Sequence, residues 1–204
     1  MSILQFFAKG GLVMWPILFC SVIMLAIFCE RLWRFARVRL AGPDLAAQVG
    51  RAMAAGAPEA ARQKAEEDPG PLGRVLGAAT AINHRDRETL ETVLIDAQQA
   101  EMRHLERYLP ALAAIGNIAP LLGLLGTVMG MIKAFMVIQE MGGKVNAVVL
   151  AGGIWEAMIT TAFGLIVALP AMAAHSYLAG RVDRFHDNLE TLTVAFVKAL
   201  SNGR

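Results

Sequence analysis

Three long stretches of the chain lack charged side chains and alternate with polar segments. Residues 10–29, 108–132 and 145–180 are uncharged apart from Glu156, and in the second stretch apolar side chains continue past Lys133 to Ile138. An α-helix rises about 1.5 Å per residue, so each stretch is long enough to cross the roughly 30 Å hydrocarbon core of a bilayer. The pattern predicts transmembrane helices over residues 10–33, 108–139 and 147–180.

The polar segments between and after these spans also have helical patterns. Four prolines divide residues 34–107 into short helices. From Glu88 onward, apolar residues recur at spacings of mostly three or four, which predicts one long helix running into the second span. Residues 182–199 have apolar positions spaced 3-4-3-4-3, which is typical of a coiled-coil seam. The seam packs either on residues 88–107 of the same subunit or on a neighbouring subunit. The prolines are Pro43, Pro58, Pro69 and Pro71.

Basic residues near the ends of the spans predict the orientation in the membrane. Eight arginines lie on one side, whereas the other side has only Lys9 and Lys144, with Lys133 near it. We therefore expect residues 1–9 and the connector 140–146 outside, and residues 34–107 and 181–204 in the cytoplasm. The arginines are Arg31, Arg34, Arg37, Arg39, Arg103, Arg107, Arg181 and Arg184.

Composition narrows the class of protein. The chain is 56% hydrophobic and 18% charged, with a mean hydropathy of +0.50, which fits an integral membrane protein rather than a soluble domain. A net charge of +2 is too small to indicate nucleic-acid binding. The four histidines are scattered, and we found no metal-ligand spacing, nucleophile elbow or phosphate loop. We therefore expect an all-α membrane protein with no cofactor, no bound metal and no catalytic site of its own.

Glu156 is the most informative residue, because a carboxylate in a membrane span is expensive to keep in lipid. Such a residue tends to line a bundle interior or a water-filled path that handles ions or protons. Thr127 and Thr161 lie about 18 and 21 Å from the outer ends of their antiparallel spans. Glu156 lies about 13 Å from the outer end of the third span. The three side chains predict a polar route through the membrane.

Small residues recur along the same two spans. Gly123, Gly126 and Gly130 in the second span, and Gly164 in the third, have spacings that let helices approach closely in lipid. Ordinary helix packing accounts for these glycines, but it does not account for Glu156. Lys133 is near the outer interface, where we expect its long side chain to extend to the lipid headgroups.

Two segments resemble a known family. Residues 118–131, IAPLLGLLGTVMGM, are similar to the second span of the ExbB/TolQ proton-channel family, and residues 155–170, WEAMITTAFGLIVALP, to its third span. The opening GLVMWPI of residues 11–17 and ERL of residues 30–32 resemble its first span. The likeness is weakest over residues 41–67. Three spans argue against the four-span flagellar stator branch, and Lys133 is not part of the family pattern.

The resemblance implies a partnership in the bacterial inner membrane. It implies a pentamer of this chain around the helices of a dimeric, single-span ExbD/TolR-like partner, whose helix carries a protonatable aspartate. Thr127 and Thr161 match the pore-lining threonines of the family, and Glu156 matches its third-span glutamate. Proton flow would then energise outer-membrane transport through a TonB-like protein, or maintenance of the envelope.

Two other classes of function remain open on the residues alone. One is a self-sufficient channel or transporter in which Glu156 itself binds and releases the ion, although a single carboxylate and no inverted repeat weigh against it. The other is a scaffold whose glutamate only fixes helix register. We therefore expect a proton-channel, stator-like subunit of a motor driven by the proton motive force.

Overall fold

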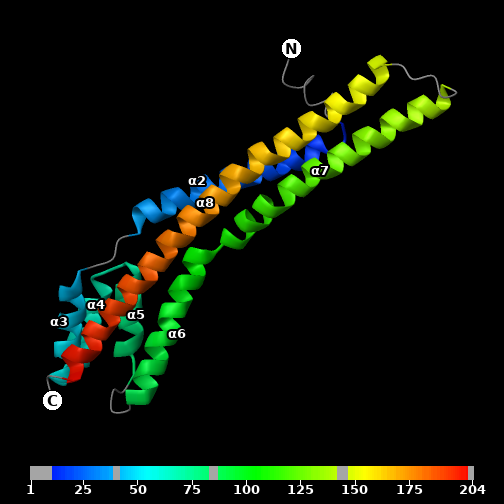
Figure 1. The fold of residues 1–204 in the computed structure, drawn as a ribbon. Helices are drawn as coiled ribbons and strands as arrows, with labels where there is room; N and C mark the ends of the chain where they lie inside the picture. The colour runs from blue at the N-terminus through cyan, green and yellow to red at the C-terminus, as the bar shows by residue number, and fades with distance from the viewer. Residues whose placement is uncertain (1–10, 39–41, 83–86, 142–146, 202–204) are drawn as a thin grey trace. The chain divides into compact units, whose positions relative to one another are not determined.

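The computed structural model describes residues 11–38, 42–82, 87–141 and 147–201. These residues are 90% helical and contain no strand, so the prediction of an all-α protein is confirmed. The predicted N-terminal segment 1–9 and most of the connector 140–146 lie outside the described residues. The helices, shown in Figure 1, are α2 (Met14–Arg37), α3 (Pro43–Ala54), α4 (Pro58–Glu66), α5 (Pro71–Thr80), α6 (Arg87–Glu106), α7 (Leu109–Glu140) and α8 (Ala147–Ser201).

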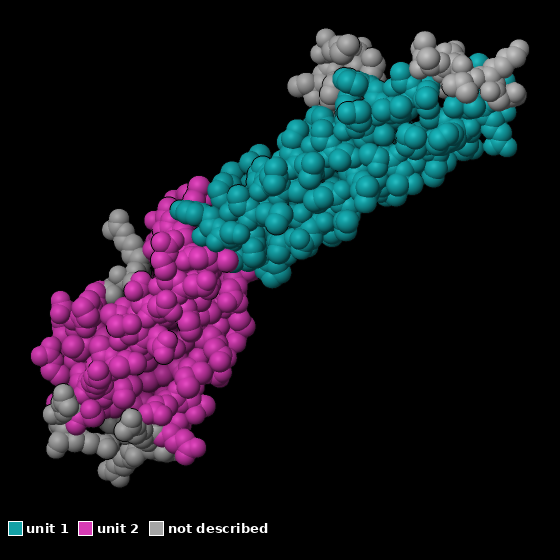
Figure 2. Space-filling model, viewed as in Figure 1, with its two compact units in different colours: residues 1–31, 108–177 teal, residues 32–107, 178–204 magenta. Residues whose placement is uncertain are grey.

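The chain divides into two compact units (Figure 2). Unit 1 comprises residues 1–31 and 108–177, and unit 2 comprises residues 32–107 and 178–204. Two helices belong to both units: α2 near its end, and α8, whose residues 147–177 lie in unit 1 and whose remainder lies in unit 2.

Unit 1 contains most of the apolar helical sequence. Among the described residues, three helical stretches, which include α2, α7 and α8, are long and apolar enough to cross a membrane; their 18-residue apolar windows have mean hydropathies of 1.8, 2.1 and 1.9. Many of their large apolar side chains are exposed, among them Phe19, Leu121 and Ile166. Exposed apolar surface on such helices fits a lipid environment, because lipid tails are as apolar as the side chains.

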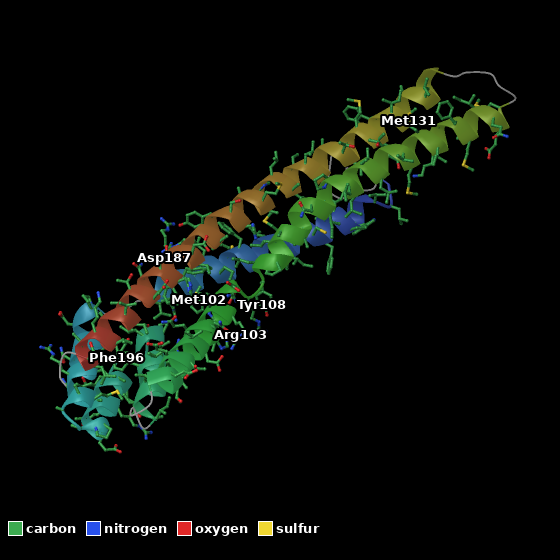
Figure 3. All side chains as sticks on the ribbon, turned by 60° about the horizontal axis from the view of Figure 1, so that its bottom comes forward. Met102, Arg103, Tyr108, Met131, Asp187 and Phe196 are labelled. Carbon is green, nitrogen blue, oxygen red and sulfur yellow. The ribbon has the colours of Figure 1, made fainter. Side chains whose placement is uncertain are left out.

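The predicted single helix from Glu88 into the second span is wrong. The structure has two helices, α6 and α7, which are separated at Arg107 and Tyr108 (Figure 3). Tyr108 adopts a left-handed conformation with φ 71°. Pro110 follows at the start of α7. Proline lacks an N–H donor and its ring clashes with the carbonyl four residues earlier, so the helix of residues 87–106 does not continue through it.

Unit 2 begins with the short helices that the prolines predict. Pro43, Pro58 and Pro71 each occupy the first turn of their helix, where a missing N–H costs nothing. The carboxylate of Asp68 accepts hydrogen bonds from the backbone N–H groups of Gly70 (2.9 Å) and Gly73 (3.1 Å). It therefore satisfies two donors at the start of α5 that the helix itself leaves unpaired.

The core of unit 2 contains buried side chains from α3, α4 and α5 as well as from α6 and the end of α8. In α6, Leu90, Leu94 and Leu105 are buried, and in α8, Leu189 and Phe196 are fully buried (Figure 3 labels Phe196). Gln98 of α6 donates a 2.6 Å hydrogen bond to the Thr193 hydroxyl of α8. The coiled-coil-like seam thus packs within the same subunit, which was the first of the two alternatives.

Candidate functional site

The site predicted from sequence lies where α7 and residues 147–177 of α8 pack against each other in unit 1. The four predicted glycines all lie at this contact. A Cβ on Gly126 would overlap the Thr160 side chain, one on Gly130 would come within 3.0 Å of the Gly153 carbonyl, and one on Gly164 within 2.6 Å of the Ala119 carbonyl. A Cβ on Gly123 would lie 3.0 Å from the Thr161 Cα. The two backbones approach so closely that a side chain does not fit between them.

The two predicted threonines lie within about one helical turn of each other. The Thr161 hydroxyl donates a 3.0 Å hydrogen bond across the contact to the carbonyl of Gly123, four residues before Thr127. The Thr127 hydroxyl donates a 2.6 Å hydrogen bond to the Leu124 carbonyl of its own helix. Both side chains are half-buried.

These two hydrogen bonds determine which donor and acceptor sites of the threonine hydroxyls remain free. A hydroxyl has one hydrogen to donate and two lone pairs that accept, and in both threonines a carbonyl already takes the hydrogen. The remaining lone pairs accept hydrogen bonds from a water molecule or from a protonated carboxylic acid. A bare carboxylate has no hydrogen to donate, so the pair favours a proton-loaded group over an unloaded one.

Glu156 is paired rather than isolated. Its Oε1 atom lies 2.8 Å from the Nζ of Lys133, in an ion pair that joins α8 to α7. The Glu156 side chain is 25% exposed and that of Lys133 is 53% exposed. The prediction that Lys133 only extends to the lipid headgroups is therefore wrong, because the register of the two helices brings its ammonium group within reach of Glu156.

The sequence contains a signal for this pair. The depth estimate that places Thr127 level with Thr161 in an antiparallel pair also places Lys133 level with Trp155, the residue before Glu156. A lysine side chain is long enough to bridge the small remaining offset. Matching the levels of all polar residues in the two spans would have identified the pair.

A third segment contacts the same ion pair. Gly11, which precedes α2, has a φ of +74°, and a Cβ built on it would overlap the Glu156 Oε1 atom and lie 3.5 Å from the Lys133 Nζ. Only glycine adopts this backbone conformation without a steric cost, and only glycine leaves room for the carboxylate here.

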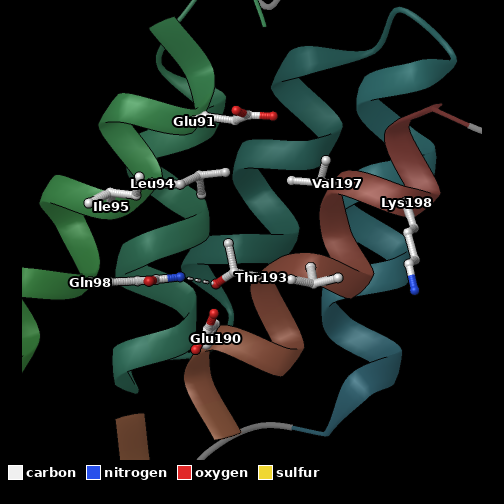
Figure 4. A pocket seen from close by; sticks show the side chains of 9 residues that line it. Glu91, Leu94, Ile95, Gln98, Glu190, Thr193, Val197 and Lys198 are labelled. Carbon is white, nitrogen blue, oxygen red and sulfur yellow. Dashed lines mark hydrogen bonds between the residues drawn. The ribbon is translucent and has the colours of Figure 1, made fainter. Parts of the chain in front are cut away.

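Unit 2 has a separate groove of about 420 Å³ between α6 and α8 (Figure 4). Leu94, Ile95 and Val197 give it an apolar lining, with Glu91 and Lys198 among its charged residues. Within the described ranges, no group of three or more His, Cys, Asp or Glu side chains is placed to hold a metal ion. Thr127, Thr161, Lys133 and Glu156 all lie on the two helices of the α7–α8 contact.

A comparison with known protein families assigns the chain to one of them. A model of the MotA/TolQ/ExbB proton channel family matches residues 67–191, which is more than half of the chain. The chain belongs to the MotA/TolQ/ExbB proton channel family. The match includes α7, the intramembrane part of α8 and all of Thr127, Lys133, Glu156 and Thr161.

Several relatives match along most of the chain. The biopolymer transport protein exbB1 of Vibrio cholerae is 33% identical over 195 residues, covering 93% of this chain and 84% of the relative. The putative biopolymer transport protein ExbB homolog of Methanothermobacter thermautotrophicus is 28% identical over 192 residues, covering 94% of this chain and 68% of the relative. The Tol-Pal system protein TolQ of Haemophilus influenzae is 41% identical over 88 residues, a shorter match that covers 43% of this chain and 38% of the relative.

Proposed function

We propose that this chain is the proton-channel subunit of a motor in the bacterial inner membrane that is driven by the proton motive force. The family supplies the proton-channel class. The observation that supports the proposal most directly is the half-buried pair Thr127 and Thr161, whose hydroxyls have only acceptor sites left. In this proposal Thr127, Thr161 and Glu156 line the proton path, and the glycines hold α7 and α8 together beside it.

The proposed partners follow from membership of the family, and the acceptor sites of the two threonines are consistent with them. A path that offers acceptors needs a carboxylic acid that loads and unloads protons, and we assign that acid to the helix of an ExbD/TolR-like single-span dimer. Five copies of this chain would surround the dimer, with the N-terminus in the periplasm and the C-terminus in the cytoplasm. A TonB-like protein would carry the energy to outer-membrane transport.

Between the two branches of the proposed output, the extent of similarity favours the ExbB type. The Vibrio cholerae exbB1 protein matches 93% of this chain, whereas the Haemophilus influenzae TolQ protein matches 43%. In the TolQ-like alternative the motor maintains envelope integrity. Identity over short matches does not favour it, because TolQ of Haemophilus influenzae is 41% identical over 88 residues and ExbB of Neisseria gonorrhoeae is 43% identical over 77 residues. Complementation of strains that lack one or the other system separates these two outputs.

The proposal is tested by proton uptake into liposomes that contain the chain with its single-span partner. We expect Thr127→Val and Thr161→Val each to lower the rate by about tenfold, which corresponds to losing roughly one hydrogen bond. Thr191→Val is the matched control, because its hydroxyl also donates to a carbonyl of its own helix but lies in unit 2. Full proton uptake in both threonine variants would show that Thr127 and Thr161 are not part of the proton path. Proton uptake without the partner would favour a self-sufficient channel.

A further inference from the structure

The Lys133–Glu156 ion pair is the feature of unit 1 that the proposed proton path leaves unexplained. It joins the outer halves of α7 and α8 at 2.8 Å, and the backbone of Gly11 covers the carboxylate so closely that a methyl group would overlap Oε1. Three segments that are far apart in the sequence therefore meet at one charge pair. The question is whether Glu156 relays protons or is held as a fixed ion.

The physical chemistry of the pair favours a fixed ion. The Lys133 ammonium donates a charge-assisted hydrogen bond to the Glu156 carboxylate, and such bonds are stronger than those between neutral groups. A group that relays protons passes through its neutral form in every cycle, and here that step requires the ammonium to move away first. Separation would break the 2.8 Å hydrogen bond that joins α8 to α7.

We propose that Lys133 is a positioning residue that keeps Glu156 ionised and fixed between Gly11, α7 and α8, so that Glu156 lines the proton path without relaying protons. This inference rests on the proposed function. It assigns the relay to a carboxylic acid outside this chain, and it gives the threonine acceptors a proton-loaded group to bind. It also explains why Gly11 has no side chain, since any Cβ would displace the carboxylate.

The two hypotheses differ in which single variant should lose more proton uptake, Lys133→Met or Glu156→Gln. If the pair is a fixed positioning device, Lys133→Met is the more harmful change, because it leaves a one-quarter exposed carboxylate unpaired, whereas Glu156→Gln leaves a half-exposed lysine that extends to the headgroups. If Glu156 relays protons, Glu156→Gln abolishes uptake and Lys133→Met is mild. Lys198→Met, on an exposed lysine in unit 2, is the control.

The double variant Lys133→Met/Glu156→Gln decides between them. It replaces the ion pair with two neutral side chains of similar size. For a fixed pair we expect it to recover proton uptake to within about threefold of the unaltered complex, from a loss of about tenfold or more in Lys133→Met. Uptake that stays as low as in Glu156→Gln would overturn the proposal. If Lys133→Met does not assemble, recovery of both assembly and uptake in the double variant is the same test.

An infrared measurement on the chain alone separates this inference from the proposed function. A protonated carboxylic acid has a C=O stretching band that a carboxylate lacks. We expect no such band from Glu156 in the unaltered chain, whose spectrum in this region should match that of Lys133→Met/Glu156→Gln, which lacks Glu156. A Glu156 band in the unaltered chain would overturn the inference. Absence of proton uptake with the partner would instead overturn the proposed function and leave the infrared result standing.

Discussion

The contacts that α8 makes with α7 and with α6 use opposite packing. In unit 1, α7 and α8 meet through glycine, so that backbone lies against backbone at Gly126, Gly130 and Gly164. In unit 2, α6 and the end of α8 meet through large buried side chains such as Leu94, Leu189 and Phe196. The helix α8 changes from one kind of packing to the other along its length.

The difference follows from the solvent that each unit is suited to. In water, burying apolar side chains is the dominant favourable contribution, so large residues stabilise unit 2. In lipid, an apolar side chain gains little by leaving the lipid tails, and close contact between backbones together with hydrogen bonds across helices becomes more important. The hydrogen bond from Thr161 to the Gly123 carbonyl is an example of the second kind. Adding a side chain at the α7–α8 contact should therefore destabilise unit 1, whereas shortening a side chain at the α6–α8 contact should destabilise unit 2.

The largest expected effect is the loss of a large side chain in unit 2. Phe196 is fully buried, and Phe196→Ala should lower the free energy of unfolding of this unit by about 3–5 kcal/mol. Hydrogen exchange followed by mass spectrometry, in detergent, checks this and shows whether the opening is confined to residues 32–107 and 178–204. Val194→Ala, at a position 46% exposed on the same helix, should change little. Equal effects of the two changes would contradict the assignment of the core.

A smaller effect is expected from adding a single methyl group in unit 1. Gly126→Ala places a Cβ on the Thr160 side chain, and such overpacking should cost about 1–3 kcal/mol. Thermal unfolding in detergent, followed by circular dichroism, measures the loss. Gly152→Ala is the matched control on α8, because its Cβ would meet nothing within 4 Å. A Gly126→Ala variant as stable as Gly152→Ala would show that the helices do not need this close approach.

The smallest expected effect concerns a charged contact on the surface of unit 2. The guanidinium of Arg74 forms two 2.6 Å hydrogen bonds with the Glu101 carboxylate, which raise the pKa of Arg74. A raised pKa contributes stability below the unfolded value, so the contribution is present at neutral pH and lost only in strong alkali. Arg74→Lys removes the two-pronged geometry and should cost about 0.5 kcal/mol after solvent screening, measured by urea unfolding.

The control for this prediction is a fully exposed pair in the same unit. Arg62 and Glu66 lie one turn apart on α4 at 2.8 Å, with both side chains mostly exposed. Arg62→Lys should leave the unfolding midpoint unchanged. If Arg62→Lys and Arg74→Lys shift the midpoint equally, the contact between α5 and α6 contributes no more than an ordinary surface pair.

Several features were predictable because they depend on local sequence. The prolines at residues 43, 58 and 71 predict the starts of three short helices, and the structure places each in a first turn. The spacing of apolar residues from Glu88 onward predicts a helical stripe, of which Leu90, Leu94 and Leu105 are buried and Tyr108 is exposed. The break at Tyr108 was missed because the apolar stripe continues through it, although Pro110 marks where the backbone cannot remain helical.

The sequence by itself determined that this protein has three apolar spans, a family and a short set of polar residues within those spans, because hydropathy and helical period are properties of consecutive residues. Only the tertiary structure decided which of those residues meet. The pairing of Lys133 with Glu156, and of Thr161 with the Gly123 carbonyl, depends on the register between two helices. That register is set by how closely the glycines let the backbones approach, and such closeness is a property of two packed surfaces.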